Sequence, residues 1–328
     1  MSANYLLIAL MSFLLSILFI SLLRKIVTKY NILKLKETPL IGGISMGISF
    51  IMVSLVIFFI RGDIPLEIIG IIFSSTLMLI FGIIDDWREL SVLAKFLTQI
   101  IAATLLIIFG IRTQIIYIGS FLNLIITYIW VLAITNAFNH LDILDGLAAG
   151  IAILVGLSFF AIGLLNHQSV IIILSLALTS ATFGFFIFNF PPARIYMGNC
   201  GSHFLGFVLS AIALAISYAP LEKNIALYSP LLILGLPIFD TAFLILIRTI
   251  KNKLPFNKSN DHLALRLLNL GFSKEKTLWV MLVWGLFFSF SGVLVSQVNN
   301  FWGKSIIIIA LVVCLAVTQK ASRISVDG

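Results

Sequence analysis

The chain contains many runs of apolar residues that are each long enough to cross a lipid bilayer. A membrane-spanning α-helix needs about 20 such residues. Eleven runs qualify: 4–23, 43–60, 67–84, 93–111, 121–138, 147–166, 168–188, 203–219, 226–247, 277–297 and 304–319. Backbone groups in lipid must be satisfied within the protein, and these runs lack the alternation of barrel strands. We therefore predict an all-α integral membrane bundle of about eleven transmembrane helices, forming one polytopic domain over residues 1–328.

The composition excludes an ordinary soluble domain. Apolar residues make up 61% of the chain and charged residues 10%, whereas soluble domains carry about 25% charged residues. The mean hydropathy is +1.16. A chain with so few charges cannot cover a water-facing surface, so lipid must surround most of it.

The basic residues predict the orientation. If the N-terminus lies outside, the inner loops hold 17 of the 21 Lys and Arg, and the exceptions are Arg61, Arg112, Lys223 and Lys304. Cytoplasmic loops carry such an excess. We therefore expect an outside N-terminus and a cytoplasmic C-terminus. The net charge of +8 then reflects topology and anionic headgroups, and no nucleic-acid partner is expected.

Two adjacent carboxylates, Asp85 and Asp86, follow one predicted span directly. Neighbouring carboxylates repel each other unless a cation or solvent screens them. They could supply oxygen ligands to a hard divalent ion. The alternative is a hydrated helix end that pairs with Arg88 and Lys95.

A second polar cluster occupies 136–146, between two apolar runs. Asn139, Asp142 and Asp145 recur at steps of three residues, so neighbouring members can meet on one side of a helical turn. The stretch has no Lys or Arg, and its carboxylates need a cation or a partner elsewhere. The alternative is a helix end whose side chains satisfy free backbone groups.

Two further inner loops carry polar residues. The loop at 188–202 combines prolines and glycines with Arg194 and Tyr196, which could meet a phosphate and a nucleotide base. The loop at 249–276 contains His262 and Arg266, which share a face if they lie on a helix. Asp240 is an intramembrane acid and is functional by default, although its role is obscure.

At these residues the chain resembles the polyprenyl-phosphate N-acetylhexosamine-1-phosphate transferases of glycosyl transferase family 4, including the undecaprenyl-phosphate GlcNAc-1-phosphate transferases. The likeness runs from about residue 36 to residue 276. Its landmarks are Thr38-Pro39 with Gly42-Gly43, Asp85-Asp86 with Lys95 and Gln99, 136–146, 192–206, Pro237 with Asp240-Thr241, and 262–266. The last loop lacks a run of three histidines, so the chain looks closer to the UDP-N-acetylhexosamine branch than to the muramoyl-pentapeptide branch.

The chain departs from the family pattern at three places. It has Asp142-Ile143-Leu144-Asp145-Gly146 where the family usually has Asp-Gly-x-Asp-Gly. It has Asn199 where the family has an aspartate that binds magnesium. The last loop has Ala264 and Leu265 where further histidines are usual.

The resemblance implies transfer of a sugar-1-phosphate from a UDP-N-acetylhexosamine to polyprenyl phosphate, with release of UMP. The site would face the cytoplasm from the inner membrane and use Mg²⁺, with Mn²⁺ as an alternative. Homo-oligomerisation stays open. Two other functions also stay open: a non-catalytic relative that binds lipid phosphate, and an ion-coupled transporter, although transporters place charges near the bilayer midplane.

The resemblance also implies residue roles. Magnesium would be held by Asp145, Asn199 and one of the Asp85-Asp86 pair, with Asp86 as the assigned ligand. The other member of the pair, or Asp142, would deprotonate the lipid phosphate. Substrate contacts would come from Asn139 and Tyr196 at the nucleotide, His262 and Arg266 at the diphosphate, and Lys95. His262 is also a catalytic candidate.

Overall fold

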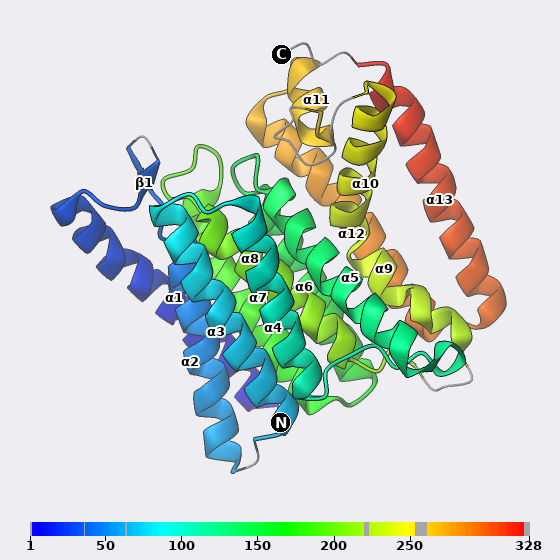
Figure 1. Ribbon diagram of the computed structural model, residues 1–328, viewed down its shortest axis with the longest axis horizontal. Coiled ribbons are helices and arrows are strands. Elements are labelled where there is room, and N and C mark those ends of the chain that lie inside the picture. Colours follow the sequence, from blue (N-terminus) through cyan, green and yellow to red (C-terminus); the bar gives the residue numbers. More distant parts are fainter. Residues whose placement is uncertain (1, 36, 63, 220–222, 253–260, 325–328) are drawn as a thin grey trace.

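The computed structural model describes residues 2–35, 37–62, 64–219, 223–252 and 261–324 (Figure 1). The first helices are α1 (Ser2–Tyr30), α2 (Gly42–Arg61), α3 (Leu66–Trp87), α4 (Val92–Ile108), α5 (Gly119–Leu141), α6 (Leu147–Leu165) and α7 (Ser169–Asn189). They are followed by α8 (Gly198–Ala215), α9 (Ser229–Ile233), α10 (Gly235–Ile250), α11 (Leu263–Asn269), α12 (Lys274–Gln297) and α13 (Asn300–Ser322). The short elements are the 3₁₀ turns η1 (Ile116–Ile118) and η2 (Asn224–Tyr228) and the strands β1 (Lys34–Leu35) and β2 (Thr38–Pro39).

The helical membrane architecture is confirmed. Within the described residues, nine helices are long and apolar enough to cross a membrane. The segments 224–233 and 235–250 together form one broken candidate, bent by 72°, and α4 is a shorter apolar helix. Each of the eleven predicted runs overlaps one of these elements, although 93–111 and 203–219 extend past the ends of α4 and α8. The exact number of spans and their orientation stay predictions.

The core is organised around α8, which is the most buried of the candidate spans and packs against both α3 and α5. Glycines allow this close contact. A Cβ on Gly206 would lie 2.7 Å from the Cα of Thr135 in α5, and one on Gly82 would overlap the backbone of Cys200. Small residues at such crossings let helix backbones meet directly. The least buried candidate span, α13, stands at the edge of the bundle (Figure 1).

The polar loops gather at one end of the bundle. In Figure 1 the hairpin of β1 and β2, the helix α11 and the end of α13 lie at the upper end, and the start of α1 lies at the lower end. The hairpin is tied to the loop before α8, because Tyr196 N donates to Pro39 O at 2.9 Å and Gly43 N donates to Met197 O at 3.0 Å. These bonds bring 38–43 and 194–198 together beside the start of α8.

Candidate active site

Asp86 joins the end of α3 to the start of α8. Its Oδ1 accepts from Asn199 N at 2.7 Å and its Oδ2 accepts from Cys200 N at 3.0 Å. The first amides of a helix have no intrahelical partner and carry partial positive charge, so a carboxylate is stabilised there. Gly198 has φ +74°, and a Cβ there would overlap the Asp86 carboxylate. Asp86 therefore fixes α8 at the site.

Asp85 is buried and has protein partners on both oxygens. Its Oδ1 accepts from Leu90 N at 2.8 Å, and its Oδ2 pairs with Lys95 Nζ at 2.7 Å. This is the ion pair with Lys95 that the alternative interpretation of the sequence predicted. The roles of Asp85 in proton transfer and of Lys95 in substrate binding stay predictions.

The end of α5 contacts the start of α8 through amide side chains. Asn139 Nδ2 donates to Asn199 Oδ1 at 3.1 Å and to Ser202 Oγ at 2.9 Å. These bonds place Asn199 beside the 136–146 cluster, although Asn139 and Asn199 are 60 residues apart in the chain. The structure therefore brings together two of the predicted site residues from different clusters.

Asp142 differs from Asp85 and Asp86 because its side chain has no hydrogen bond to any described residue. It lies in the connection between α5 and α6 and is half-buried. The pKa of the Asp142 carboxyl is raised to about 7, mainly by burial and to a smaller extent by the charges of Asp86 and Asp145. A carboxyl with this pKa can take up a proton near neutral pH.

Asp145 lies at the edge of the same cluster. Its Oδ2 accepts from Ala193 N at 3.3 Å and meets the exposed Lys274 Nζ at 3.4 Å. Asn189 ties the neighbouring loops together, because its Oδ1 accepts from Gly146 N at 2.9 Å and its Nδ2 donates to Ile195 O at 2.9 Å. The 188–202 loop is thus fixed against the acidic cluster. No sequence pattern indicated this role for Asn189.

Tyr196 stands on this fixed loop. Its side chain is half-buried and has no hydrogen bond to a described residue. Its predicted stacking on the nucleotide base stays a prediction.

His262 and Arg266 take different partners. His262 precedes α11, and its Nδ1 lies 2.8 Å from Asp240 Oδ2. The guanidinium of Arg266 is 2% exposed and binds the backbone and side chain of Asp261 and the carbonyls of Ala321 and Ile324. These contacts tie α11 to the end of α13, and the diphosphate-binding role of Arg266 stays a prediction.

Residues 68–217 match the model of glycosyl transferase family 4. A probable undecaprenyl-phosphate N-acetylglucosaminyl 1-phosphate transferase of Bacillus subtilis is 34% identical over 259 residues, covering 75% of this chain and 70% of the relative.

The chain belongs to glycosyl transferase family 4.

Two further relatives are also similar to the chain. A decaprenyl-phosphate N-acetylglucosaminephosphotransferase of Mycolicibacterium smegmatis is 30% identical over 287 residues, covering 76% of this chain and 70% of the relative. A phospho-N-acetylmuramoyl-pentapeptide-transferase of Streptococcus pneumoniae is 28% identical over 196 residues, covering 55% of this chain and 60% of the relative.

The side-chain donors of this candidate site are oxygen atoms, which are the ligands that hard divalent ions prefer. Among the described residues, no group of three or more His, Cys, Asp or Glu side chains forms a complete metal cage. Magnesium does not need one, because it usually keeps several waters and binds one or two carboxylates together with substrate phosphates. Among the described residues, Asp145 makes contacts through Oδ2 only, which leaves its Oδ1 available to an ion. The donor set is therefore suitable for magnesium.

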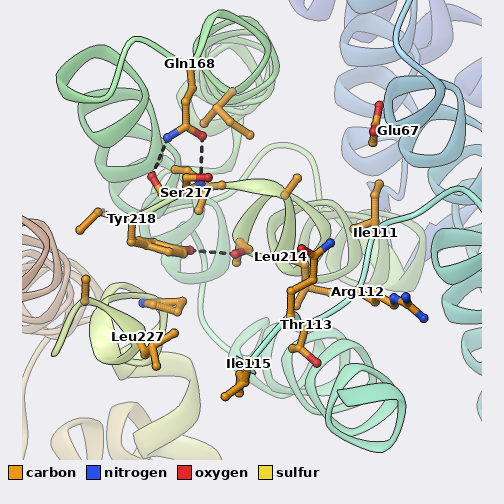
Figure 2. Close-up of a pocket in the computed structure, with 18 of the residues that line it drawn as sticks. Glu67, Ile111, Arg112, Thr113, Ile115, Gln168, Leu214, Ser217, Tyr218 and Leu227 are labelled. Carbon is orange, nitrogen blue, oxygen red and sulfur yellow. Dashed lines mark hydrogen bonds between the residues drawn. The ribbon is translucent and has the colours of Figure 1, made fainter. Parts of the chain in front are cut away.

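A separate cavity of about 900 Å³ opens at the opposite end of the family 4 bundle, where α4 and α8 end (Figure 2). Its wall is held by Gln168, whose Oε1 accepts from Ser217 N at 2.9 Å, and by Tyr218, whose hydroxyl donates to Ala213 O at 3.0 Å. None of the predicted site residues lines this cavity.

Proposed function

We propose that this family member transfers an N-acetylhexosamine-1-phosphate from a UDP-sugar to polyprenyl phosphate and releases UMP. The observation that carries the proposal is the state of Asp142. This half-buried carboxylate has no hydrogen-bond partner among the described residues, and the negative charges of Asp86 and Asp145 contribute to its raised pKa. The names of the relatives in Bacillus subtilis and Mycolicibacterium smegmatis support a polyprenyl-phosphate acceptor and an N-acetylglucosamine donor.

In the proposed reaction an oxygen of the lipid phosphate attacks the β-phosphorus of the UDP-sugar. A new P–O bond forms, the bond from the β-phosphorus to the bridging oxygen breaks, and UMP leaves with that oxygen. Asp142 takes the proton of the lipid phosphate, since its raised pKa suits proton transfer near neutral pH. Asn139 and Tyr196 contact the nucleotide, and His262 stands at the diphosphate.

The proposed metal is magnesium, with manganese as the alternative. Asp145, Asn199 and Asp86 would hold it, although Asp86 already accepts two backbone hydrogen bonds. A carboxylate has about four lone-pair sites, so these bonds leave it able to bind an ion. When bound, the ion neutralises charge as the anionic phosphates meet.

The deciding experiment measures UMP release by the purified protein with polyprenyl phosphate, magnesium and a panel of UDP-sugars. We expect UMP with at least one UDP-N-acetylhexosamine and none when the lipid phosphate is omitted. Binding of the lipid phosphate without UMP release from any donor would favour the non-catalytic alternative.

Removal of the metal is expected to stop turnover. Clustered carboxylate and amide oxygens suit hard cations, so excess EDTA should reduce UMP release to background and added magnesium or manganese should restore it. Zinc, which prefers nitrogen and sulfur ligands, should restore little. Undiminished turnover in excess EDTA would rule out this metal site.

The orientation is tested by labelling single cysteines in a variant that lacks Cys200 and Cys314. Glu275 is exposed at the carboxylate end of the bundle and Arg112 is exposed at the opposite end. A membrane-impermeant thiol reagent should label Glu275→Cys from the cytoplasmic side only and Arg112→Cys from the outside only. The reverse pattern would overturn the predicted orientation and the cytoplasmic site.

A further inference from the structure

Asp240 is a buried carboxylate whose two oxygens both contact the segment formed by His262 and Leu263. In α10, its Oδ2 lies 2.8 Å from His262 Nδ1, and its Oδ1 accepts from Leu263 N at 2.9 Å. Asp240 is 1% exposed and His262 is 4% exposed. Both contacts cross the gap between α10 and the start of α11, at the upper end of the bundle in Figure 1.

These two contacts determine how the imidazole ring is presented. An ionised carboxylate only accepts hydrogen bonds, so His262 must carry its proton on Nδ1 to bond with Asp240. In the neutral ring, Nε2 is then the free acceptor. The bond to Leu263 N fixes the backbone next to His262, so Asp240 sets both the place and the tautomer of the ring.

The pair connects to the carboxylate site through His140. The rings of His140 and His262 lie edge to face with their centroids 6.3 Å apart. His140 is in the last turn of α5, next to Asn139 and two residues before Asp142. The buried Asp240 is thereby linked, through two rings, to the residues proposed to meet the substrates.

We propose that Asp240 is a positioning residue for the transferase reaction. It acts through His262, by holding Nδ1–H so that Nε2 is the ring atom that faces the substrate phosphates and exchanges a proton or hydrogen bond with them. This inference rests on the proposed function and adds a residue to it that makes no contact with substrate itself.

The competing explanation is that Asp240 only caps α11. Replacement of Asp240 by asparagine distinguishes the capping role from the positioning role, because Asn and Asp cap helices about equally well. In Asp240→Asn the amide oxygen can still accept from Leu263 N, but the amide nitrogen would donate to His262 Nδ1. The ring proton must then move to Nε2, so the cap is kept and the tautomer is reversed.

The kinetic test compares UMP release by the parent, Asp240→Asn, His262→Gln and the double variant. Loss of the partner that orients a metal-binding histidine typically costs about tenfold to a hundredfold in activity, and we expect the same range for His262. We expect kcat of Asp240→Asn to fall by about that factor with little change in KM. In the His262→Gln background the same substitution should cost nothing more. An equal loss in both backgrounds, or a parental kcat for Asp240→Asn, would overturn the inference.

Asn299→Ala serves as the control for loss of a helix cap. Asn299 caps α13 at the opposite end of the bundle, where its Oδ1 accepts from Trp302 N at 3.1 Å. This variant should melt at a lower temperature but keep the parental kcat. Asp240→Asn should show the reverse, with an almost unchanged melting temperature and a reduced kcat.

A spectroscopic measurement tests the inference without relying on turnover. The chain has four histidines, so ¹⁵N labelling of histidine gives few signals, and His262→Gln identifies those of His262. We expect the Nδ1–H form in the parent and the Nε2–H form in Asp240→Asn. The same tautomer in both proteins would refute the positioning role. Absence of UMP release in the parent would refute the proposed function and with it a role for Asp240 in that reaction, whereas a tautomer reversed in Asp240→Asn would still show that Asp240 sets the state of the ring.

Discussion

Replacing Asp142 with asparagine should lower the turnover number about a thousandfold while leaving the fold intact. A positioned general base contributes about 10²–10⁴-fold to a reaction rate. Asn has the shape of Asp but cannot take up the proton of the lipid phosphate. Because the Asp142 side chain has no hydrogen bond to a described residue, its replacement breaks no hydrogen bond within the described part of the fold.

Thermal stability provides the check that the loss is chemical. The pKa of Asp142 is raised from 3.8 to about 7 in the folded protein. The folded state therefore loses stability as pH rises from about 4 to about 7, because the unfolded chain gives up this proton more readily. The neutral asparagine removes that loss, so Asp142→Asn should melt at or above the parental temperature at pH 7.5.

The pH profile gives a second readout for Asp142. UMP release by the parent should rise with pH as this carboxyl loses its proton. The midpoint should move to lower pH as magnesium is increased, because a nearby cation favours the carboxylate form. Glu67→Gln is the matched control, since it neutralises an exposed carboxylate at the opposite end of the bundle. A turnover number for Asp142→Asn within threefold of the parent would exclude Asp142 as the base.

The helical bundle could be predicted from the sequence because lipid leaves few alternatives for a long apolar run. The break within the predicted span 226–247 could not be located in this way. That run divides between Ile233 and Gly235 and bends by 72°, and both sides of the break are rich in apolar residues. Pro237, just inside α10, was the available local signal.

The polar clusters were predicted as candidates, but their partners depend on how distant helices pack. Asp240 and His262 are 22 residues apart, and Arg266 and Ala321 are 55 residues apart. Spacing along the chain gives no sign of either contact. The sequence also could not show that Asp86 caps α8, because that depends on the close approach of α3 at Gly82 and Gly198.

The departure at Asn199 leads to the second large expected effect. Asn199→Asp should reduce the magnesium concentration needed for half-maximal activity by about tenfold or more, because charge count is a main determinant of affinity in oxygen sites. In the parent, Asn139 Nδ2 donates to Asn199 Oδ1 at 3.1 Å. The substitution keeps this contact, since a carboxylate oxygen can still accept from Asn139 Nδ2.

The melting temperature, measured with and without magnesium, tests the same prediction without an activity assay. The new carboxylate would stand beside Asp86, which binds the backbone N–H of residue 199 at 2.7 Å. Without magnesium the two charges repel, so Asn199→Asp should melt below the parent. Added magnesium should raise its melting temperature more than that of the parent, because a ligand that binds the folded state more tightly stabilises it more.

Asp145→Asn should act in the opposite direction, because it removes a proposed ligand charge. It should need more magnesium and lose most of the turnover even at saturation. Asn299→Asp is the matched control, since it adds the same charge at the α13 cap and Asn and Asp cap about equally well. Its magnesium curve should coincide with that of the parent. If Asn199→Asp also gives the parental curve in both activity and melting, then Asn199 is outside the metal site, and the ion must be held by the acids of the 136–146 cluster without it.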